Sequence, residues 1–192
     1  VATYWPEFGQ AGKERITIRQ IMAHQSGLYH IRQMIDHADR MRDWDHMVEA
    51  IERSTPIHRP GERTGYHGLT YGFLVGEILQ RVTDTPFPEL VQNELAEPLG
   101  LDGLYIGAPD RVLDRAAELI WPNRLPRPGS AAPKGRKRPE DMVHAGASWL
   151  GDALMRYANV DLDLASILDA LVPRGISRFD FGAEDTLRVA IP

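Results

Sequence analysis

The pattern of hydrophobic and polar positions predicts a mainly helical chain. Between residues 69 and 82, apolar residues cover one wide helical face, whereas Glu77, Gln80 and Arg81 fall outside it. A second apolar stripe at the i, i+3, i+4, i+7 spacing predicts a helix over residues 44–54; its members are Trp44, Met47, Val48 and Ile51. Gly72 and Gly76 inside the first of these helices indicate close approach to a neighbouring element.

Capping residues set the expected helix starts. Thr17 with Gln20 three residues later forms a capping box before a short helix that should end at Ser26–Gly27, with Ile18, Ile21 and Met22 facing the core. Asp43 is the expected cap of the helix over residues 44–54. Thr85 is the expected cap of a helix over residues 86–98, with its apolar residues inward: Phe87, Leu90, Val91 and Leu95.

The second half of the chain has a weaker pattern. Residues 104–107 and 187–192 read as short strands, and residues 108–120 as a short helix capped by Asp110. Residues 122–141 are rich in proline and basic residues, which predicts a surface loop. Two further helices are expected, over residues 144–158 and 161–172. We therefore divide the chain into a helical region, 1–110, and a Pro/Arg-rich loop with further helices, 111–192.

Composition is that of a globular protein that binds a small molecule or another protein. Of 192 residues, 43% are hydrophobic and 26% charged, and the net charge of −5 gives no reason to expect nucleic acid as a partner. No apolar run approaches the ~18 residues of a membrane span. The first residues lack the features of a signal peptide, and both ends read as cut from something longer, so the compartment is unknown and a soluble, cytoplasmic protein is the default.

Several chemistries find no support in the residues. Cysteine is absent, and the seven histidines show neither H-E-x-x-H nor H-x-H spacing, so we expect no metal and no cofactor. A G-x-S-x-G elbow, a P-loop and a G-x-G-x-x-G fingerprint are also missing. Ser26 beside His24 could be a nucleophile, but the favoured interpretation is that it ends the helix and orders the next turn through backbone hydrogen bonds.

Tyr66 is the residue around which the chain is best interpreted. It follows a Pro-Gly turn in the loop over residues 58–66 and directly precedes the helix that begins near Leu69. From there its phenol could face a cleft, although acting as a base would require cationic neighbours to lower its pKa from about 10. Without further information, a packed aromatic is the more economical interpretation.

Four blocks, taken together, resemble the serine β-lactamase-related superfamily, and more narrowly its class C β-lactamase-like and penicillin-binding-protein-like esterases. They are ITIRQIMAHQSGL (16–28), a P-G-x-x-x-x-Y-H-G segment (60–68), LTYGFLVGEILQRVT (69–83) and ELAEPLGLD (94–102). The blocks occur in the family's order over about residues 4–107. The resemblance implies an antiparallel sheet plus helices, of which this chain would supply the helical domain and its connections.

The resemblance also implies a three-part active site. In this family the nucleophile is the serine of S-x-x-K with its lysine as proton acceptor, the tyrosine of Y-x-N assists proton transfer, and a K-T-G or H-x-G strand flanks the oxyanion hole. Tyr66 matches the second motif. None of the six serines has lysine three residues later, so we expect the nucleophile and the third motif in the remainder of the parent chain.

The departures from the motif guide the functional prediction. Gly68 stands where β-lactamases have asparagine, which disfavours β-lactam hydrolysis and favours an esterase acting on small ester substrates. Tyr29 and Trp121 could line the substrate pocket or could be packing aromatics, and His67 is given no catalytic role. The alternatives are a β-lactamase or D-Ala-D-Ala peptidase, and a non-catalytic helical module that binds a ligand near Tyr66. The isolated 192 residues are expected to be inactive.

Overall fold

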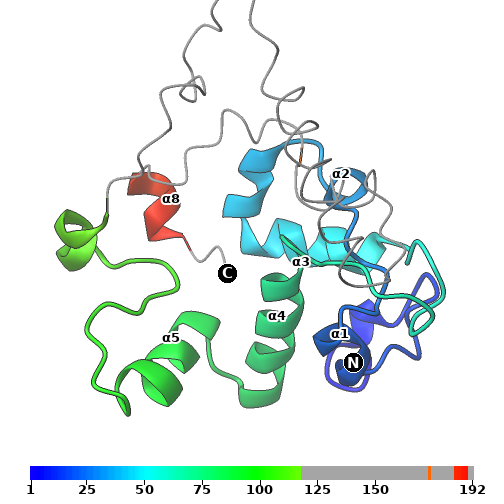
Figure 1. Ribbon diagram of the computed structural model, residues 1–192, viewed down its shortest axis with the longest axis horizontal. Coiled ribbons are helices and arrows are strands. Elements are labelled where there is room, and N and C mark those ends of the chain that lie inside the picture. Colours follow the sequence, from blue (N-terminus) through cyan, green and yellow to red (C-terminus); the bar gives the residue numbers. More distant parts are fainter. Residues whose placement is uncertain (118–172, 174–183, 190–192) are drawn as a thin grey trace, which may run out of the picture.

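The computed structural model describes residues 1–117, residue 173 and residues 184–189, and within these ranges the chain forms helices and no β-strand (Figure 1). This agrees with the prediction of a mainly helical chain. The helices, in chain order, are the 3₁₀-helix η1 (Pro6–Phe8), α1 (Ile18–Met22), α2 (Ile31–Met34), the 3₁₀-helix η2 (Ala38–Arg42), α3 (Trp44–Arg53), α4 (Tyr71–Thr83), α5 (Phe87–Val91), the π-helical segment η3 (Gln92–Ala96), the 3₁₀-helix η4 (Asp110–Arg115) and α8 (Glu184–Arg188).

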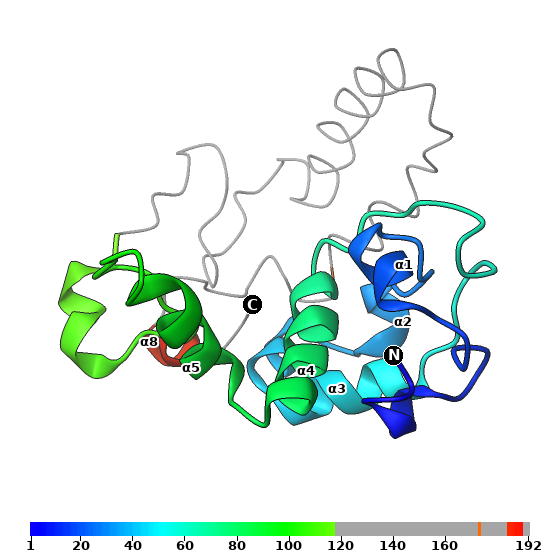
Figure 2. The ribbon, with the colours of Figure 1, turned by 90° about the horizontal axis from the view of Figure 1, so that it is seen from below.

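Helix α4 is the central element of the described part. It packs against α3, and α1 and α5 contact it on opposite sides, as both ribbon views show (Figures 1 and 2). The buried stripe predicted for α3 is confirmed, because Met47, Val48 and Ile51 are all buried. They join one apolar cluster with residues from η1, α1, α2 and α4, including Trp5, Phe8, Ile21, Ile31, Phe73 and Leu74. Burial of each such side chain stabilises the fold by roughly 1.5–3 kcal/mol.

Two of the predicted helix caps are confirmed. The Thr17 hydroxyl accepts a hydrogen bond from the Gln20 backbone N–H, and the Gln20 side chain accepts one from the Thr17 N–H, which completes the capping box of α1. Asp43 Oδ1 accepts from the His46 N–H at 3.0 Å and caps α3. Each cap satisfies a donor that the first helical turn leaves free.

The close approach predicted from glycine in α4 is confirmed for Gly76. A Cβ atom at this position would lie 2.6 Å from Cη2 of Trp44 and 3.1 Å from Phe87. Since real Cβ contacts are longer than this, only glycine lets α3 and α5 approach α4 so closely. Gly76 therefore helps to fix the helix that follows the Tyr66 loop.

Several boundary and facing predictions were wrong. Helix α1 ends at Met22, earlier than Ser26–Gly27, because His24 adopts a left-handed φ of 56°. Ile18 and Met22 are exposed, as are Leu79, Val82 and Leu95.

The predicted cap of the helix after residue 85 fails, as do the predicted strand over residues 104–107 and the described part, 187–189, of the strand predicted over 187–192. Thr85 makes no cap, since Pro86 occupies that position and the Phe87 N–H is satisfied by Gln80 Oε1 at 2.7 Å. Asp110 lies in the first turn of η4 and Pro109 is its cap. Residues 104–107 form no strand, and 187–188 belong to α8. The helices expected over 144–158 and 161–172 lie outside the described residues.

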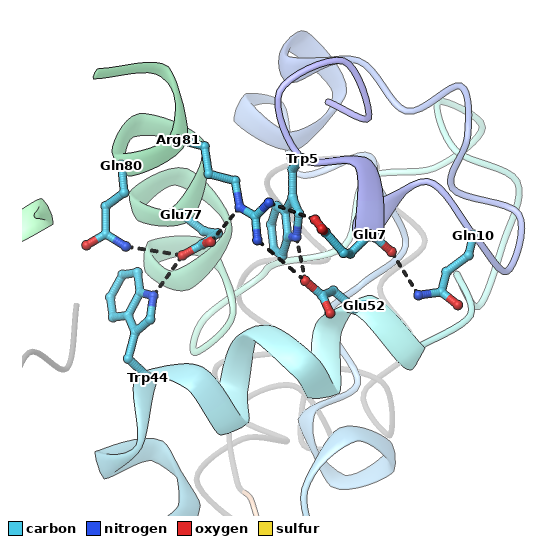
Figure 3. Close-up of polar contacts among 8 residues, drawn as sticks. All are labelled: Trp5, Glu7, Gln10, Trp44, Glu52, Glu77, Gln80 and Arg81. Carbon is cyan, nitrogen blue, oxygen red and sulfur yellow. Dashed lines mark hydrogen bonds and ion pairs between the residues drawn. The ribbon is translucent and has the colours of Figure 1, made fainter. Parts of the chain in front are cut away.

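Glu77, predicted to lie outside the apolar face of α4, is buried in a polar network between α4, α3 and η1 (Figure 3). Its carboxylate accepts hydrogen bonds from Trp44 Nε1 at 2.8 Å and Arg81 Nε at 2.7 Å. Arg81 also pairs with Glu7 at 2.7 Å and lies 3.8 Å from Glu52. A buried carboxylate needs such partners, and in this case they hold α4 in register with its neighbours.

Candidate functional site

Tyr66 lies in the loop between α3 and α4, and 56% of the residue is exposed. The interpretation of Tyr66 as a packed aromatic is therefore not supported for most of this residue. Its ring contacts the His24 ring, with 5.4 Å between the centroids. The Tyr66 ring thus packs against His24 on one side and is exposed on the other.

The backbone on both sides of Tyr66 is fixed by hydrogen bonds. The Gly65 N–H donates to the His24 carbonyl at 2.9 Å, and the His67 N–H donates to His24 Nδ1 at 3.3 Å. The His67 carbonyl accepts from the Tyr71 N–H at 3.1 Å, in the first turn of α4. An exposed side chain is therefore carried on a backbone that is held at both neighbours.

His67 is fully buried, and its contacts define its tautomer. Its Nδ1 lies 2.7 Å from the Gly65 carbonyl oxygen, which can only accept, so Nδ1 carries the proton. Nε2 is then the acceptor, and the Ser26 hydroxyl donates to it at 2.6 Å. His24 Nδ1, which accepts from the His67 backbone, lies 3.3 Å from His67 Nδ1. The imidazole therefore bridges the Tyr66 loop and the turn that contains Ser26.

Both imidazoles are held in the neutral form. Burial lowers the pKa of His67 to about 4, which outweighs the opposing effect of its hydrogen bond to the Gly65 carbonyl, while nearby His24 and His58 lower it further. Burial also lowers the pKa of His24. At neutral pH the groups beside Tyr66 therefore offer hydrogen bonds and ring surface but no positive charge.

Ser26 orders the turn after α1, in agreement with the interpretation favoured from the sequence. It is fully buried, and its Oγ accepts from the Leu28 N–H at 3.3 Å while donating to His67. The Nδ1 atom of His67 meets a backbone carbonyl and a second imidazole; no carboxylate contact is present at this nitrogen in the described residues. Burial and this environment argue against Ser26 as the nucleophile.

The other residues singled out from the sequence occupy different settings. Tyr29 is buried beneath the Tyr66 loop, its ring packed near those of His58 and His67, and a Cβ on Gly65 would lie 2.0 Å from its Cε1. Gly68 is half-buried just before α4. Trp121 lies outside the described residues. A substrate-lining role for Tyr29, Gly68 and Trp121 remains a prediction.

Sequence reasoning assigned no role to His67 and did not pair Ser26 with it. The two residues are 41 positions apart, and nothing in the local pattern around either one connects them. One feature of the sequence could have suggested the pair: Ser26 and His67 each stand next to a glycine near the end of an apolar helix. Within the described residues, no group of three or more histidine, aspartate or glutamate side chains is arranged to hold a metal ion.

Searching the described helices for one long and apolar enough to cross a membrane finds none. A cavity of about 340 Å³ lies between α2 and the end of α3, where His30, Met34 and Arg53 line it. Tyr66 does not contribute to its walls, so this cavity is separate from the candidate site.

Comparison with known proteins identifies the family. A family model described as Beta-lactamase matches residues 1–188, so the chain belongs to the beta-lactamase family. The chain is 39% identical over 128 residues to the Mycobacterium tuberculosis protein named Esterase/beta-lactamase LipL. That match covers 65% of this chain and 29% of LipL. The resemblance inferred from the four sequence blocks is thereby confirmed.

Solved structures agree with this assignment. A penicillin-binding protein homologue from Caulobacter crescentus is 40% identical with a TM-score of 0.58, over 68% of this chain and 35% of the homologue. A family VIII carboxylesterase is 34% identical with a TM-score of 0.59, over 62% of this chain and 33% of the esterase. EstA from Arthrobacter nitroguajacolicus Rue61a, at 21% identity and TM-score 0.66, supports the fold alone. The matched part of the chain thus spans about a third of the length of LipL, the penicillin-binding protein homologue and the carboxylesterase, and 43% of EstA.

Proposed function

We propose that this chain supplies the proton-handling tyrosine of a serine hydrolase that cleaves small carboxylic esters through an acyl-serine intermediate. The observation that carries the proposal is an exposed phenol at Tyr66, on a backbone fixed at both neighbours, at the position that matches the family's second motif. Family membership and relatives named as esterases support the hydrolase class.

The reaction is acyl transfer to water in two steps. A serine hydroxyl attacks the ester carbonyl and its proton passes to the Tyr66–lysine pair, which then protonates the departing alcohol; water hydrolyses the acyl-serine by the reverse proton path. Backbone N–H groups stabilise the oxyanion. We place the S-x-x-K nucleophile and the third motif in the remainder of the full-length protein, because no serine of this chain has lysine three residues later.

The charges around Tyr66 indicate which residue supplies the cation that this mechanism needs. A phenol titrates near 10 and becomes a useful base only beside positive charge. The adjacent imidazoles of His24 and His67 cannot supply that charge at neutral pH, since burial lowers the pKa of each. The lysine of the S-x-x-K motif is therefore the expected cation, and Tyr66 should lose its function as a base if that lysine is removed.

Substrate preference is inferred from Gly68. A glycine offers no side chain amide to a substrate carbonyl, whereas asparagine at this position would, so esters are the preferred class over β-lactams. The β-lactamase alternative has specific support in the name of one relative, Esterase/beta-lactamase LipL. Hydrolysis of a chromogenic cephalosporin, measured beside that of short-chain nitrophenyl esters, separates the two substrate classes.

Two matched tyrosine variants of the full-length protein test the proposal. Tyr66→Phe should lower kcat for short-chain nitrophenyl esters by ~10² or more with an unchanged fold, the range of a general acid–base group. Tyr71→Phe removes another phenol from the same region, one whose hydroxyl donates to the Met22 sulfur at 3.4 Å, and should keep kcat within about threefold. Wild-type turnover by Tyr66→Phe would refute the assignment.

The isolated 192 residues provide a second test. They should hydrolyse no ester, since the nucleophile is expected elsewhere in the full-length protein. Intact-mass analysis after incubation with a nitrophenyl ester should show no acylated chain. An acyl adduct on any of the six serines would mean that this chain contains a nucleophile after all.

A further inference from the structure

We infer that Ser26 and His67 are positioning residues for Tyr66: the buried hydrogen bond between them holds the phenol where the reaction requires it. The inference rests on the proposed function and adds to it two residues that do not touch substrate. It assigns a role to a serine and a histidine that the proposed reaction leaves unused.

His67 is linked directly to the backbone around Tyr66. The His67 ring donates from Nδ1 to the Gly65 carbonyl at 2.7 Å, so it bridges the residues before and after Tyr66. Its backbone N–H is bound to His24 Nδ1 at 3.3 Å. Rotation of the His67 ring would break the bridge across Tyr66 and take this donor from the Gly65 carbonyl, although the Gly65 and His67 backbone N–H groups would stay bonded to His24.

Ser26 fixes the His67 ring. Ser26 Oγ donates to Nε2 at 2.6 Å and is itself held by the Leu28 N–H at 3.3 Å. Both side chains are fully buried, so water cannot replace the serine hydroxyl at Nε2 without rearrangement. Loss of the hydroxyl leaves Nε2 of His67 without its donor from the turn after α1, and the contacts with His24 then remain as the link of His67 to that turn.

Catalysis by a tyrosine depends on this precision. Tyr66 is exposed, and beyond its ring contact with His24 its position is set by the backbone that carries it. A displacement of about 1 Å at a catalytic group can cost up to ~10²-fold in rate. A partial loosening of the loop should therefore lower kcat while the fold and substrate binding survive.

The chain offers a matched control for the test. Ser26→Ala removes a buried hydroxyl that bonds to His67, whereas Thr70→Val removes a buried hydroxyl that bonds to the Leu28 carbonyl at 2.8 Å. Both hydroxyls brace the same turn, but the Thr70 hydroxyl bonds to the Leu28 carbonyl and not to the side chain of His67 or Tyr66. In the full-length protein we expect Ser26→Ala to lower kcat about tenfold with KM within about threefold. Thr70→Val should lower Tm similarly and leave kcat within about threefold.

A double-mutant cycle distinguishes positioning from general damage. If Ser26 acts through Tyr66, Ser26→Ala should cause no further loss of kcat in a Tyr66→Phe background, because the positioned phenol is already gone. His67→Phe, which removes both ring nitrogens, should reproduce the loss of Ser26→Ala, and the two together should be no worse than either. If Ser26→Ala does not fold, His67→Phe provides the same test.

The results of these variants distinguish a positioning role of Ser26 from a purely structural one. Equal loss of kcat in Ser26→Ala and Thr70→Val, or multiplication of the Ser26→Ala and Tyr66→Phe effects, would show a purely structural role and overturn the inference. A strong effect of Tyr66→Phe with wild-type kcat in Ser26→Ala would overturn the inference and leave the proposed function intact. Wild-type turnover by Tyr66→Phe would overturn both.

Discussion

Acidification should destabilise the protein through His67. The imidazole is neutral in the folded state because burial lowers its pKa to about 4, whereas in the unfolded chain it titrates near 6.5. Between pH 4 and pH 6.5, the His67 imidazole is therefore protonated in most unfolded chains and neutral in most folded ones. The contribution of His67 to the free energy of unfolding is therefore fully present above pH 6.5 and is lost as the pH falls toward 4.

The size of the effect follows from the two pKa values. At pH 7 both states are mostly neutral and the contribution differs little from its maximum. At pH 5 the unfolded chain is almost fully protonated at this residue and the folded chain is mostly not, which removes about 2 kcal/mol of the free energy of unfolding. His24, whose pKa is also lowered by burial, adds to the loss in the same direction.

The assay compares the wild-type full-length protein with His67→Gln. Urea unfolding is followed by tryptophan fluorescence at pH 7 and pH 5, and Trp5, which is fully buried, reports on the apolar core. All other titrating groups are shared, so the wild type should lose about 2 kcal/mol more than the variant between the two pH values. If the wild type and His67→Gln lose the same free energy of unfolding between pH 7 and pH 5, to within about 0.5 kcal/mol, His67 is not a buried neutral group.

Two further predictions concern packing and charge. Gly65→Ala should destabilise the protein by about 1–3 kcal/mol, because its Cβ would lie 2.0 Å from the Tyr29 ring; thermal unfolding measures this, and an unchanged Tm would mean that the ring moves freely. Arg81→Met should lower the free energy of unfolding by roughly 3 kcal/mol, because it leaves the buried Glu77 without its cation. Arg53→Ala, which breaks an exposed ion pair, should cost less than about 0.5 kcal/mol in the same urea titration, and equal losses in the two arginine variants would contradict this reasoning.

Helix starts could be predicted from the sequence because capping is local. Thr17 with Gln20, and Asp43, each satisfy a backbone donor within three residues, so the spacing alone contains the information. The same holds for the stripe in α3, whose helical spacing selects the buried face. The Thr85 prediction failed because Gln80, a residue of the preceding helix, satisfies the Phe87 N–H instead.

Tertiary contacts explain the remaining differences. Glu77 looked solvent-exposed by its position on the helix, yet Trp44 and Arg81 enclose its carboxylate, and only the fold brings Trp44 to it. The same explanation applies to the candidate site, part of which depends on tertiary contacts. Tyr66 was found because its motif is a short run, whereas the Ser26–His67 pair joins two turns that are 41 residues apart.

Formation of the acyl-enzyme tests the central claim most directly, because it isolates the step in which Tyr66 is proposed to handle the serine proton. Rapid mixing of the full-length protein with excess nitrophenyl acetate measures the rate of the first nitrophenol burst. The wild type should acylate at least ~100-fold faster than Tyr66→Phe, with equal Tm for the two proteins. A Tyr66→Phe burst at the wild-type rate would contradict the claim.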